Sequence, residues 1–321
     1  MGEPGNWPHI SSSFGAFDLA GLPKSPVWWY RSWWLGNISA SDPSRPPLPA
    51  ASSAHFCRIV ESWAANPAAP ATRTIHVYTN APYVALANPA VPPAPVPVSP
   101  FGYATFRGVA FTPGSSLTAT CLAADGASAL ASHTARAWGA PAALRLSLDA
   151  PSLATGTGRA LYLDGSDVAL VRASVVDAGG NVCGDAAVRI AFGVSAGPGR
   201  VWGSGSGDPS DHEHPNAASR VTYHGLARAV VRAALVGAGS DAERAALAYV
   251  NVDAGVGGGG GSGAGTAPIL PPGQAPPTVI TVTASAPGLA SASIDIALSV
   301  DEADSVLSVA AASVGAADVG E

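Results

Sequence analysis

A helix rich in aromatic residues constrains the fold of this chain more than any other feature of the sequence. Ser25 stands where a helix N-cap is expected and Pro26 at the first helical position, which predicts a helix through 27–34. Five of those eight residues are aromatic, and they lie on more than one helical face. A helix that is apolar almost all round must be buried on several sides. The rest of the chain therefore has to supply packing partners for it.

The residues before this helix have the composition of a loop. Gly2, Pro4, Gly5 and Pro8 precede any strand or helix that could anchor them. The chain thus opens with a sequence typical of the end of a domain.

The composition of the chain favours small β domains. Charged residues make up 12% of the sequence, about half of the usual ~25%. Its 37 glycines and 29 prolines separate short apolar runs, and a length of 321 residues predicts roughly two to three domains. A net charge of −6 without a basic run argues against a nucleic-acid partner.

Targeting signals are weak in this sequence. No run of about 18 consecutive apolar residues occurs, so a membrane-spanning helix is not expected. The first residues lack the basic and apolar regions of a signal peptide, while the Asn37-Ile38-Ser39 sequon is typical of secreted proteins. The cellular location therefore stays open.

The cysteines are few and widely spaced. Cys57, Cys121 and Cys183 are odd in number, which indicates buried or free thiols and neither a disulfide scaffold nor a zinc site.

Two blocks of β pattern follow the helix. Ile75, Val77 and Thr79 alternate with polar or aromatic neighbours, which predicts a strand with one buried face. Further strands are predicted in both blocks, at 83–87, 103–111, 117–123, 143–149, 168–177, 187–194, 225–231, 278–283 and 292–300. Composition shifts divide the chain into a linker at 40–53, a β-sandwich at 54–140, a second β-sandwich at 141–300 with a Gly/Pro-rich insertion at 252–277, and a flexible tail at 301–321.

The N-terminal stretch resembles a known family. Residues 2–24 read GEPGNWPHISSSFGAFDLAGLPK and residues 28–34 read WWYRSWW. This string is similar to the last strand-to-helix loop and final helix of the catalytic (β/α)8 barrel in glycoside hydrolase family 2, the β-galactosidase and β-glucuronidase group. The resemblance implies that residues 1–39 are the C-terminal remnant of that barrel and that its other strands lie upstream of Met1.

The β blocks resemble the same family. The strand IHVYTNAPYVAL is similar to the immunoglobulin-like module that follows the barrel, and residues 201–209 are similar to the terminal immunoglobulin-like module. The resemblance implies a mainly β fold with two immunoglobulin-like β-sandwiches. One departure is Asn88-Pro89, where the family has an Asn-Gly hairpin. Proline cannot adopt the positive φ of that turn, so the tight hairpin is expected to be lost.

The family's chemistry sets the functional expectation. The resemblance implies a β-galactosidase-like enzyme that hydrolyses a terminal β-glycoside with retention and needs no cofactor. Its two catalytic glutamates come from earlier barrel strands, so this chain alone is expected to be inactive. Glu3 matches a loop position that lines or braces the substrate pocket. The sandwiches are expected to support the barrel and to mediate homo-oligomer contacts, with no membrane partner.

Two clusters allow other interpretations. A loop offers potential ligands for a divalent ion, namely Asp208, Asp211, His212, Glu213 and His214. Because prolines force a turn there, a solvated loop whose Asp side chains bond to its own backbone is favoured, and no metal site is assigned. The aromatic helix is interpreted as core packing in preference to a sugar-stacking platform.

The alternative function is a non-catalytic β-sandwich module that binds carbohydrate or acts as an adhesin. It predicts aromatic side chains exposed on a sheet face or loop tip. The densest aromatic cluster of this sequence lies instead in the helix at 27–34, which favours the hydrolase.

Overall fold

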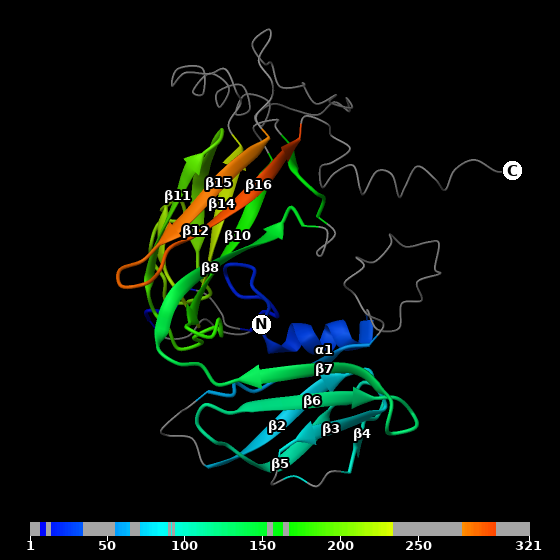
Figure 1. Cartoon of the computed structure of the whole chain (residues 1–321). Helices are drawn as coiled ribbons and strands as arrows, with labels where there is room; N and C mark the ends of the chain where they lie inside the picture. Colours follow the sequence, from blue (N-terminus) through cyan, green and yellow to red (C-terminus); the bar gives the residue numbers. More distant parts are fainter. Residues whose placement is uncertain are drawn as a thin grey trace, which may run out of the picture.

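A computed structural model of the chain describes residues 7–10, 14–34, 55–64, 71–88, 91, 94–152, 157–162, 167–233 and 278–299. In these residues the fold is mainly β, with a single helix α1 (Ser25–Trp34). Figure 1 shows a lower and an upper group of strands, with α1 at the level where the two groups meet. The prediction of a mainly β fold built from sandwiches is confirmed.

The lower group is a sandwich of two antiparallel sheets, ordered β1-β2-β5 and β4-β3-β6-β7. Its strands are β1 (Cys57–Ile59), β2 (Thr72–Thr79), β3 (Tyr83–Ala87), β4 (Val96–Pro97), β5 (Ala104–Ala110), β6 (Ser116–Leu122) and β7 (Ala129–Arg136). The predicted alternation in β2 is confirmed, because Ile75, Val77 and Thr79 are fully buried. They face a core that both sheets share.

The lower core contains a disulfide, so the prediction of three thiols is wrong for two of them. Cys57 of β1 is bonded to Cys121 of β6, and their Cα atoms lie 5.9 Å apart. The two residues face each other across the sandwich although 64 positions separate them in the sequence. Spacing alone cannot show that facing arrangement. Cys183 is a buried free thiol, and burial raises its pKa.

The connection after β3 agrees with the predicted loss of a tight hairpin. β3 pairs with β4 through Tyr83 and Pro97, so a long segment separates the two strands. Asn88, which follows β3, does not form the hairpin turn of the family. Its Nδ2 instead donates a hydrogen bond to the carbonyl oxygen of Ala110 at 2.8 Å.

The upper group is a second sandwich, with sheets ordered β12-β14-β10-β8 and β13-β11-β15-β16-β9. Its strands are β8 (Pro141–Ala150), β9 (Leu161–Tyr162), β10 (Val168–Asp177), β11 (Arg189–Ala196), β12 (Gly199–Gly205), β13 (Ser219–Val221), β14 (Leu226–Ala233), β15 (Val279–Ser285) and β16 (Ala292–Ser299). β9 and β16 pair in parallel and the other pairs are antiparallel. An apolar core fills the space between these sheets.

Strand β12 occupies a stretch for which the sequence predicted no strand. A bulge lies between Val201 and Gly203, and a Cβ at Gly203 would lie 2.4 Å from the carbonyl oxygen of Pro215. The glycine is therefore needed for the close approach of the turn at Pro215 to the backbone of β12.

The predicted linker at 40–53, insertion at 252–277 and tail at 301–321 lie outside the described residues, and the predicted domain boundaries stay predictions. Helix α1 has 10 residues, and no helix in the described residues is long and apolar enough to cross a membrane.

His133 of β7 connects the two lower sheets and gives the sandwich a pH dependence. Its Nδ1 accepts a hydrogen bond from the Ile59 amide of β1 at 3.2 Å. Burial, and secondarily the charge of Arg58, lowers the pKa of His133 from 6.5 to about 4. The fold therefore favours the neutral ring. Its contribution to stability is complete above pH 6.5 and is lost as the pH falls through about 4.

We expect the free energy of unfolding to fall between pH 6.5 and 4, and to fall less steeply in His133→Gln. Glutamine accepts the same hydrogen bond through its amide oxygen and does not titrate. Urea unfolding at a series of pH values measures both slopes. Equal slopes in the two proteins would contradict this role of His133.

Candidate functional site

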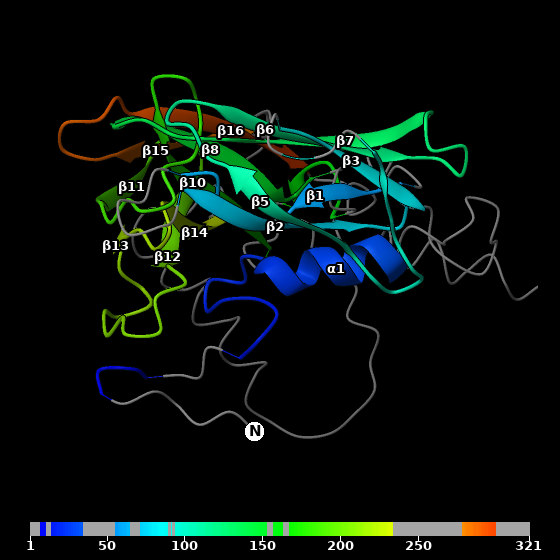
Figure 2. The ribbon, with the colours of Figure 1, turned by 90° about the horizontal axis from the view of Figure 1, so that it is seen from below.

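Helix α1 packs with one side on the lower sandwich. Figure 2 shows it running alongside β2. Trp33 is buried and its Nε1 donates to the carbonyl oxygen of Gly102 at 3.3 Å, while Trp29 Nε1 donates to that of Phe101 at 3.2 Å. Trp34 on the other side is 64% exposed. Core packing is confirmed for Trp33, but the expectation that the helix is buried on several sides is not met among the described residues.

Arg58 covers the first turns of this helix. Its neighbours Cys57 and Ile59 point into the lower core, so the alternation of β1 turns Arg58 outward toward α1. The guanidinium lies 4.1 Å from the centroid of the Trp28 ring. Burial, and then the neighbouring charge of Arg31, lowers the pKa of Arg58.

The loop at 16–24 is held in a compact shape by Asp18. The Oδ1 atom of Asp18 accepts hydrogen bonds from the amides of Ala20 at 2.9 Å and Leu22 at 2.8 Å. Gly21 between them has a φ of +71°, which glycine adopts without strain. The side chain of Leu22 is buried. The loop therefore presents its backbone in one fixed arrangement.

This loop is docked on the upper sandwich through two close approaches. Arg228 of β14 donates from Nη1 to the carbonyl oxygen of Ala20 at 2.6 Å, and it is ion-paired with Asp149 of β8. A Cβ at Gly207 would lie 2.2 Å from Oδ2 of Asp18. The Asp18 carboxylate thus packs directly against the backbone of Gly207, where any larger residue would collide with it.

Gly207→Ala is expected to release the loop at 16–24 from the upper sandwich. The added methyl group collides with a carboxylate that two backbone amides hold in place. We expect amide hydrogen exchange at Ala20 and Leu22 to rise by about tenfold or more. Gly205→Ala is the matched control, because its Cβ would lie 3.8 Å from that of Ala20, an ordinary contact. Unchanged exchange in Gly207→Ala would show that the contact does not hold the loop.

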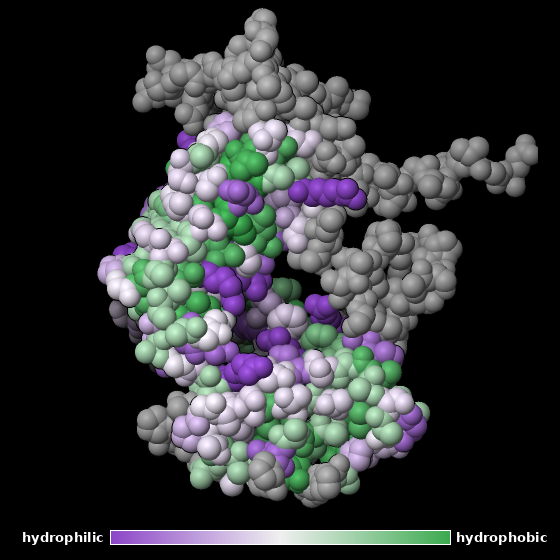
Figure 3. All heavy atoms as spheres, viewed as in Figure 1, coloured by the Kyte–Doolittle hydropathy of each residue, from purple (hydrophilic) through white to green (hydrophobic). Residues whose placement is uncertain are grey.

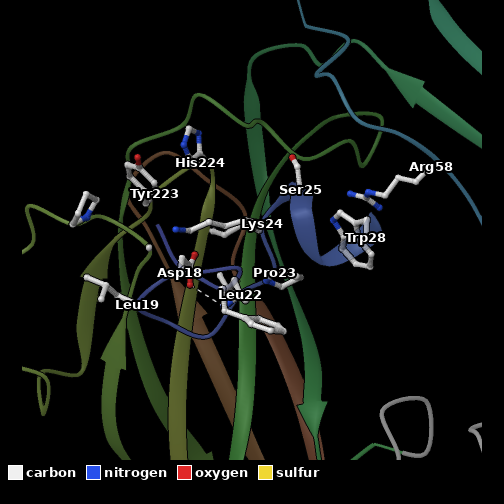
Figure 4. Close-up of a pocket in the computed structure, with 15 residues that line it drawn as sticks. Asp18, Leu19, Leu22, Pro23, Lys24, Ser25, Trp28, Arg58, Tyr223 and His224 are labelled. Atoms are coloured by element: carbon white, nitrogen blue, oxygen red, sulfur yellow. Dashed lines mark hydrogen bonds between the residues drawn. The ribbon is translucent and has the colours of Figure 1, made fainter. Parts of the chain in front are cut away.

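A cavity of about 510 Å³ lies where this loop, α1, β1 and the turn before β14 meet. Its charged or titratable lining residues are Asp18, Lys24, Arg58, Tyr223 and His224. Figure 4 shows Lys24 between Asp18 and His224, with Arg58 and Trp28 on the opposite side. Figure 3 shows a hollow between the upper and lower groups with hydrophilic residues at its rim.

The acidic loop at 208–214 has its own network of partners. The Oδ1 atoms of Asp208 and Asp211 each accept an amide hydrogen bond from two residues further along, at 2.8 Å. The prediction that these side chains bond to the loop's backbone is confirmed. Glu213 forms a bidentate ion pair with Arg189. Oδ2 of Asp211 forms an ion pair with Arg220 at 2.8 Å. Within the described ranges, no three His, Cys, Asp or Glu side chains converge as metal ligands do.

Glu3 lies outside the described residues, and its role in the pocket stays a prediction. The nearest described segment, 7–10, contacts the acidic loop. Ile10 donates its amide to the carbonyl oxygen of Pro209 at 2.8 Å, and His212 Nε2 lies 2.7 Å from that of Pro8. Residues 7–10 thus lie against the upper sandwich, close to residues far along the sequence.

Residues 154–240 match the family model for the glycoside hydrolase family 2 C-terminal domain 5. The chain matches a C-terminal part of a family 2 glycoside hydrolase. The matched range contains β9 to β14, and with them Arg228 and Gly207, which contact the loop at 16–24. No curated protein matches the chain in sequence.

Solved structures share the fold of this chain. A β-glycosidase from Bacteroides vulgatus is similar with a TM-score of 0.61 and 16% identity over 91% of this chain and 29% of its own length. A family 2 member from Bacteroides cellulosilyticus has a TM-score of 0.56 and 21% identity, over 89% and 32%. A family 2 β-glucuronidase has a TM-score of 0.57 and 22% identity, over 91% and 23%. The chain spans a quarter to a third of these proteins.

Sequence reasoning missed residues that surround the cavity. Arg58 was detectable as a charged residue between two apolar strand positions, and His224 as a residue directly before Gly225 and a predicted strand. No sequence signal brings these two together with Lys24, since the three come from segments far apart in the chain.

Proposed function

We propose that this chain is the C-terminal part of a retaining glycoside hydrolase of family 2 in which residues 1–39 complete the catalytic barrel. The observation that carries the proposal is the family match at 154–240 combined with the docking of the loop at 16–24 on that same region. A segment that belongs to the end of a barrel would be held there by the terminal module. The similar structures named as a β-glycosidase and a β-glucuronidase support this assignment.

Exposed aromatic side chains in the N-terminal segment support the proposal that another part of the intact protein covers this surface. Trp7 is 82% exposed, Phe14 77% and Trp34 64%. Large apolar groups gathered on one segment are typical of a surface that another part of the protein covers. We assign that cover to the preceding strands and helices of the barrel.

The proposed chemistry needs two carboxylates about 5 Å apart. One protonates the glycosidic oxygen while the other attacks the anomeric carbon and forms a glycosyl-enzyme. The first carboxylate then removes a proton from water, which releases the sugar with its configuration retained. We assign both carboxylates to glutamates upstream of Gly2. We assign to Glu3 the role of bracing the pocket that these glutamates line. The mechanism uses no cofactor, and the sugar is a terminal β-galactoside or β-glucuronide.

A non-catalytic carbohydrate-binding module is the second candidate. Trp202 of β12 is 39% exposed, as that function predicts for an aromatic residue on a sheet face. However, the guanidinium carbons of Arg200 and Arg232 lie 4.5 and 4.7 Å from the centroid of its ring. The ring already has cationic stacking partners, so the hydrolase is favoured.

Hydrolysis assays with nitrophenyl β-galactoside, β-glucuronide and β-mannoside test the proposal. The 321-residue chain and a version extended upstream are compared at equal concentration. We expect turnover only in the extended protein, and the preferred substrate identifies the sugar. Proton NMR of the first anomer released distinguishes retention from inversion. Turnover by the short chain would contradict the assignment of the glutamates upstream, and no turnover by either protein would favour the binding module.

A further inference from the structure

The disulfide of the lower sandwich is closed off from solvent. Cys57 is 7% exposed and Cys121 is fully buried, and both belong to the core that the two sheets share. Cys121 has paired neighbours on both sides, since β6 pairs with β3 at Val84 and with β7 at Ala131. A disulfide forms by exchange, in which a thiolate must reach a sulfur atom of the oxidant. The bond therefore has to form while the two sheets are still apart.

Strand β1 depends on this bond for its place in the sandwich. It has three residues and pairs with β2 in its own sheet. Toward the facing sheet it is attached by the disulfide and by the hydrogen bond from the Ile59 amide to His133. β1 also carries Arg58, whose guanidinium stacks on Trp28 of α1. Without the disulfide, the three-residue strand is expected to be the first part of the lower sandwich to open.

The third cysteine is buried in the upper sandwich. Cys183 has no exposed surface, and burial, followed by the charges of Asp177 and Asp185, raises the pKa of its thiol. A protonated, buried thiol is unreactive. The chain has three cysteines, and all three are among the described residues. Two sulfurs are thus bonded to each other and the third is enclosed, so the folded chain offers no exposed thiol to an oxidising environment.

We propose that the lower sandwich is completed in an oxidising compartment, where a dithiol oxidoreductase closes the Cys57–Cys121 bond before the two sheets pack. One cysteine thiolate attacks the disulfide of the oxidoreductase, which forms a mixed disulfide and releases one thiolate of that enzyme. The second cysteine thiolate then attacks the sulfur of the first and displaces the other sulfur of the oxidoreductase. Two electrons and two protons pass from the cysteines to the oxidoreductase, which leaves as a dithiol.

The proposal places the folding of this chain outside the cytosol, because cytosolic thiol systems keep cysteine pairs reduced. Sandwiches dominated by pairings between distant parts of the sequence fold slowly. The cysteines, 64 positions apart, therefore stay accessible long enough for the exchange. No step uses glycoside chemistry, so this proposal is independent of the hydrolase function.

Expression of the 321-residue chain in two compartments of one bacterial host tests the proposal. One version carries a cleavable secretion signal and reaches the periplasm, and the other stays in the cytosol. Labelling with a maleimide polymer in urea counts the free thiols of each. We expect one free thiol in the exported chain and three in the cytosolic chain. Mass spectrometry of peptides should identify Cys57 and Cys121 as the linked pair.

Trypsin digestion shows whether the bond is needed for packing. Cleavage after Arg58 is expected to be at least tenfold faster in the cytosolic chain, because β1 opens when its cross-link is absent. Cleavage after Arg189 of β11, outside the cross-linked sandwich, is the internal control and should proceed equally fast in both. The double variant Cys57→Ala, Cys121→Ala should be cleaved after Arg58 at the cytosolic rate in either compartment, which separates the bond from other effects of export.

A host whose periplasm lacks its dithiol oxidoreductase tests the assigned oxidant, and the exported chain should keep three free thiols there. One free thiol in the cytosolic chain would overturn the proposal, as would three in the exported chain of the normal host or a linked pair that includes Cys183. Equal cleavage after Arg58 in the two unaltered chains would also overturn it, since the sandwich would then pack without the bond. None of these results depends on turnover by the upstream-extended protein.

Discussion

Arg220→Met is expected to lower the free energy of unfolding of the upper sandwich by about 3–5 kcal/mol, the usual cost of removing one partner of a buried ion pair. The Arg220 side chain is 2% exposed and pairs with Asp211 at 2.8 Å. It also donates to the carbonyl oxygens of Ser204 at 2.6 Å and His214 at 2.8 Å. Methionine fills most of the volume but leaves the carboxylate and both carbonyl groups without their donor.

Urea unfolding followed by tryptophan fluorescence measures this loss. Arg189→Met is the matched control, because the Arg189 and Glu213 side chains are 52% and 33% exposed, and an ion pair so open to solvent contributes at most about 1 kcal/mol. A similar decrease in the free energy of unfolding in the two variants would contradict the central role of Arg220. A double-mutant cycle with Asp211→Asn isolates the ion pair from the hydrogen bonds to the carbonyl groups.

Replacing both Cys57 and Cys121 by alanine is expected to destabilise the lower sandwich by about 4 kcal/mol. The disulfide closes a loop across a separation of 64 residues, and the chain-entropy relation gives that figure for a loop of this length. The effect arises mainly because the cross-link restricts the unfolded chain.

Urea unfolding of the oxidised protein, the reduced protein and the double variant measures this contribution. The reduced protein should unfold at nearly the same urea concentration as the double variant. Cys183→Ala removes a buried sulfur outside the cross-link, so reductant should lower its unfolding midpoint as much as it lowers that of the unaltered protein. If reduction left the unfolding midpoint unchanged, the disulfide would not be stabilising the sandwich.

Much of the fold was predictable because strand signals are local. Alternation identified β2, and a Val-rich run bounded by turn residues identified β10. Strand β12 was missed because its glycines suit a close approach of Pro215, which only the assembled sheet shows. The disulfide was missed for a similar reason, since Cys57 and Cys121 face each other only once two sheets have packed.

The aromatic helix was placed correctly, but its surroundings were not. Apolar side chains all round a helix predict burial on all sides, yet Trp34 and Tyr30 are exposed. The indole N–H groups of Trp29 and Trp33 bond to the loop at 101–102, which orients one side of the helix toward the lower sandwich. The cavity itself was not predictable, because its lining residues Lys24, Arg58 and His224 come from three separate segments of the chain.

The hydrogen bond from Arg228 to Ala20 also has a consequence for the order in which the chain assembles. The two residues are 208 positions apart, and residues 16–24 are made long before β14 exists. During synthesis this loop and its neighbouring aromatic residues therefore have no upper sheet to rest on. Contacts of such long range form late and slow the completion of folding. The loop at 16–24 is thus among the last segments of this chain to reach its final position, although it is made before the upper sandwich.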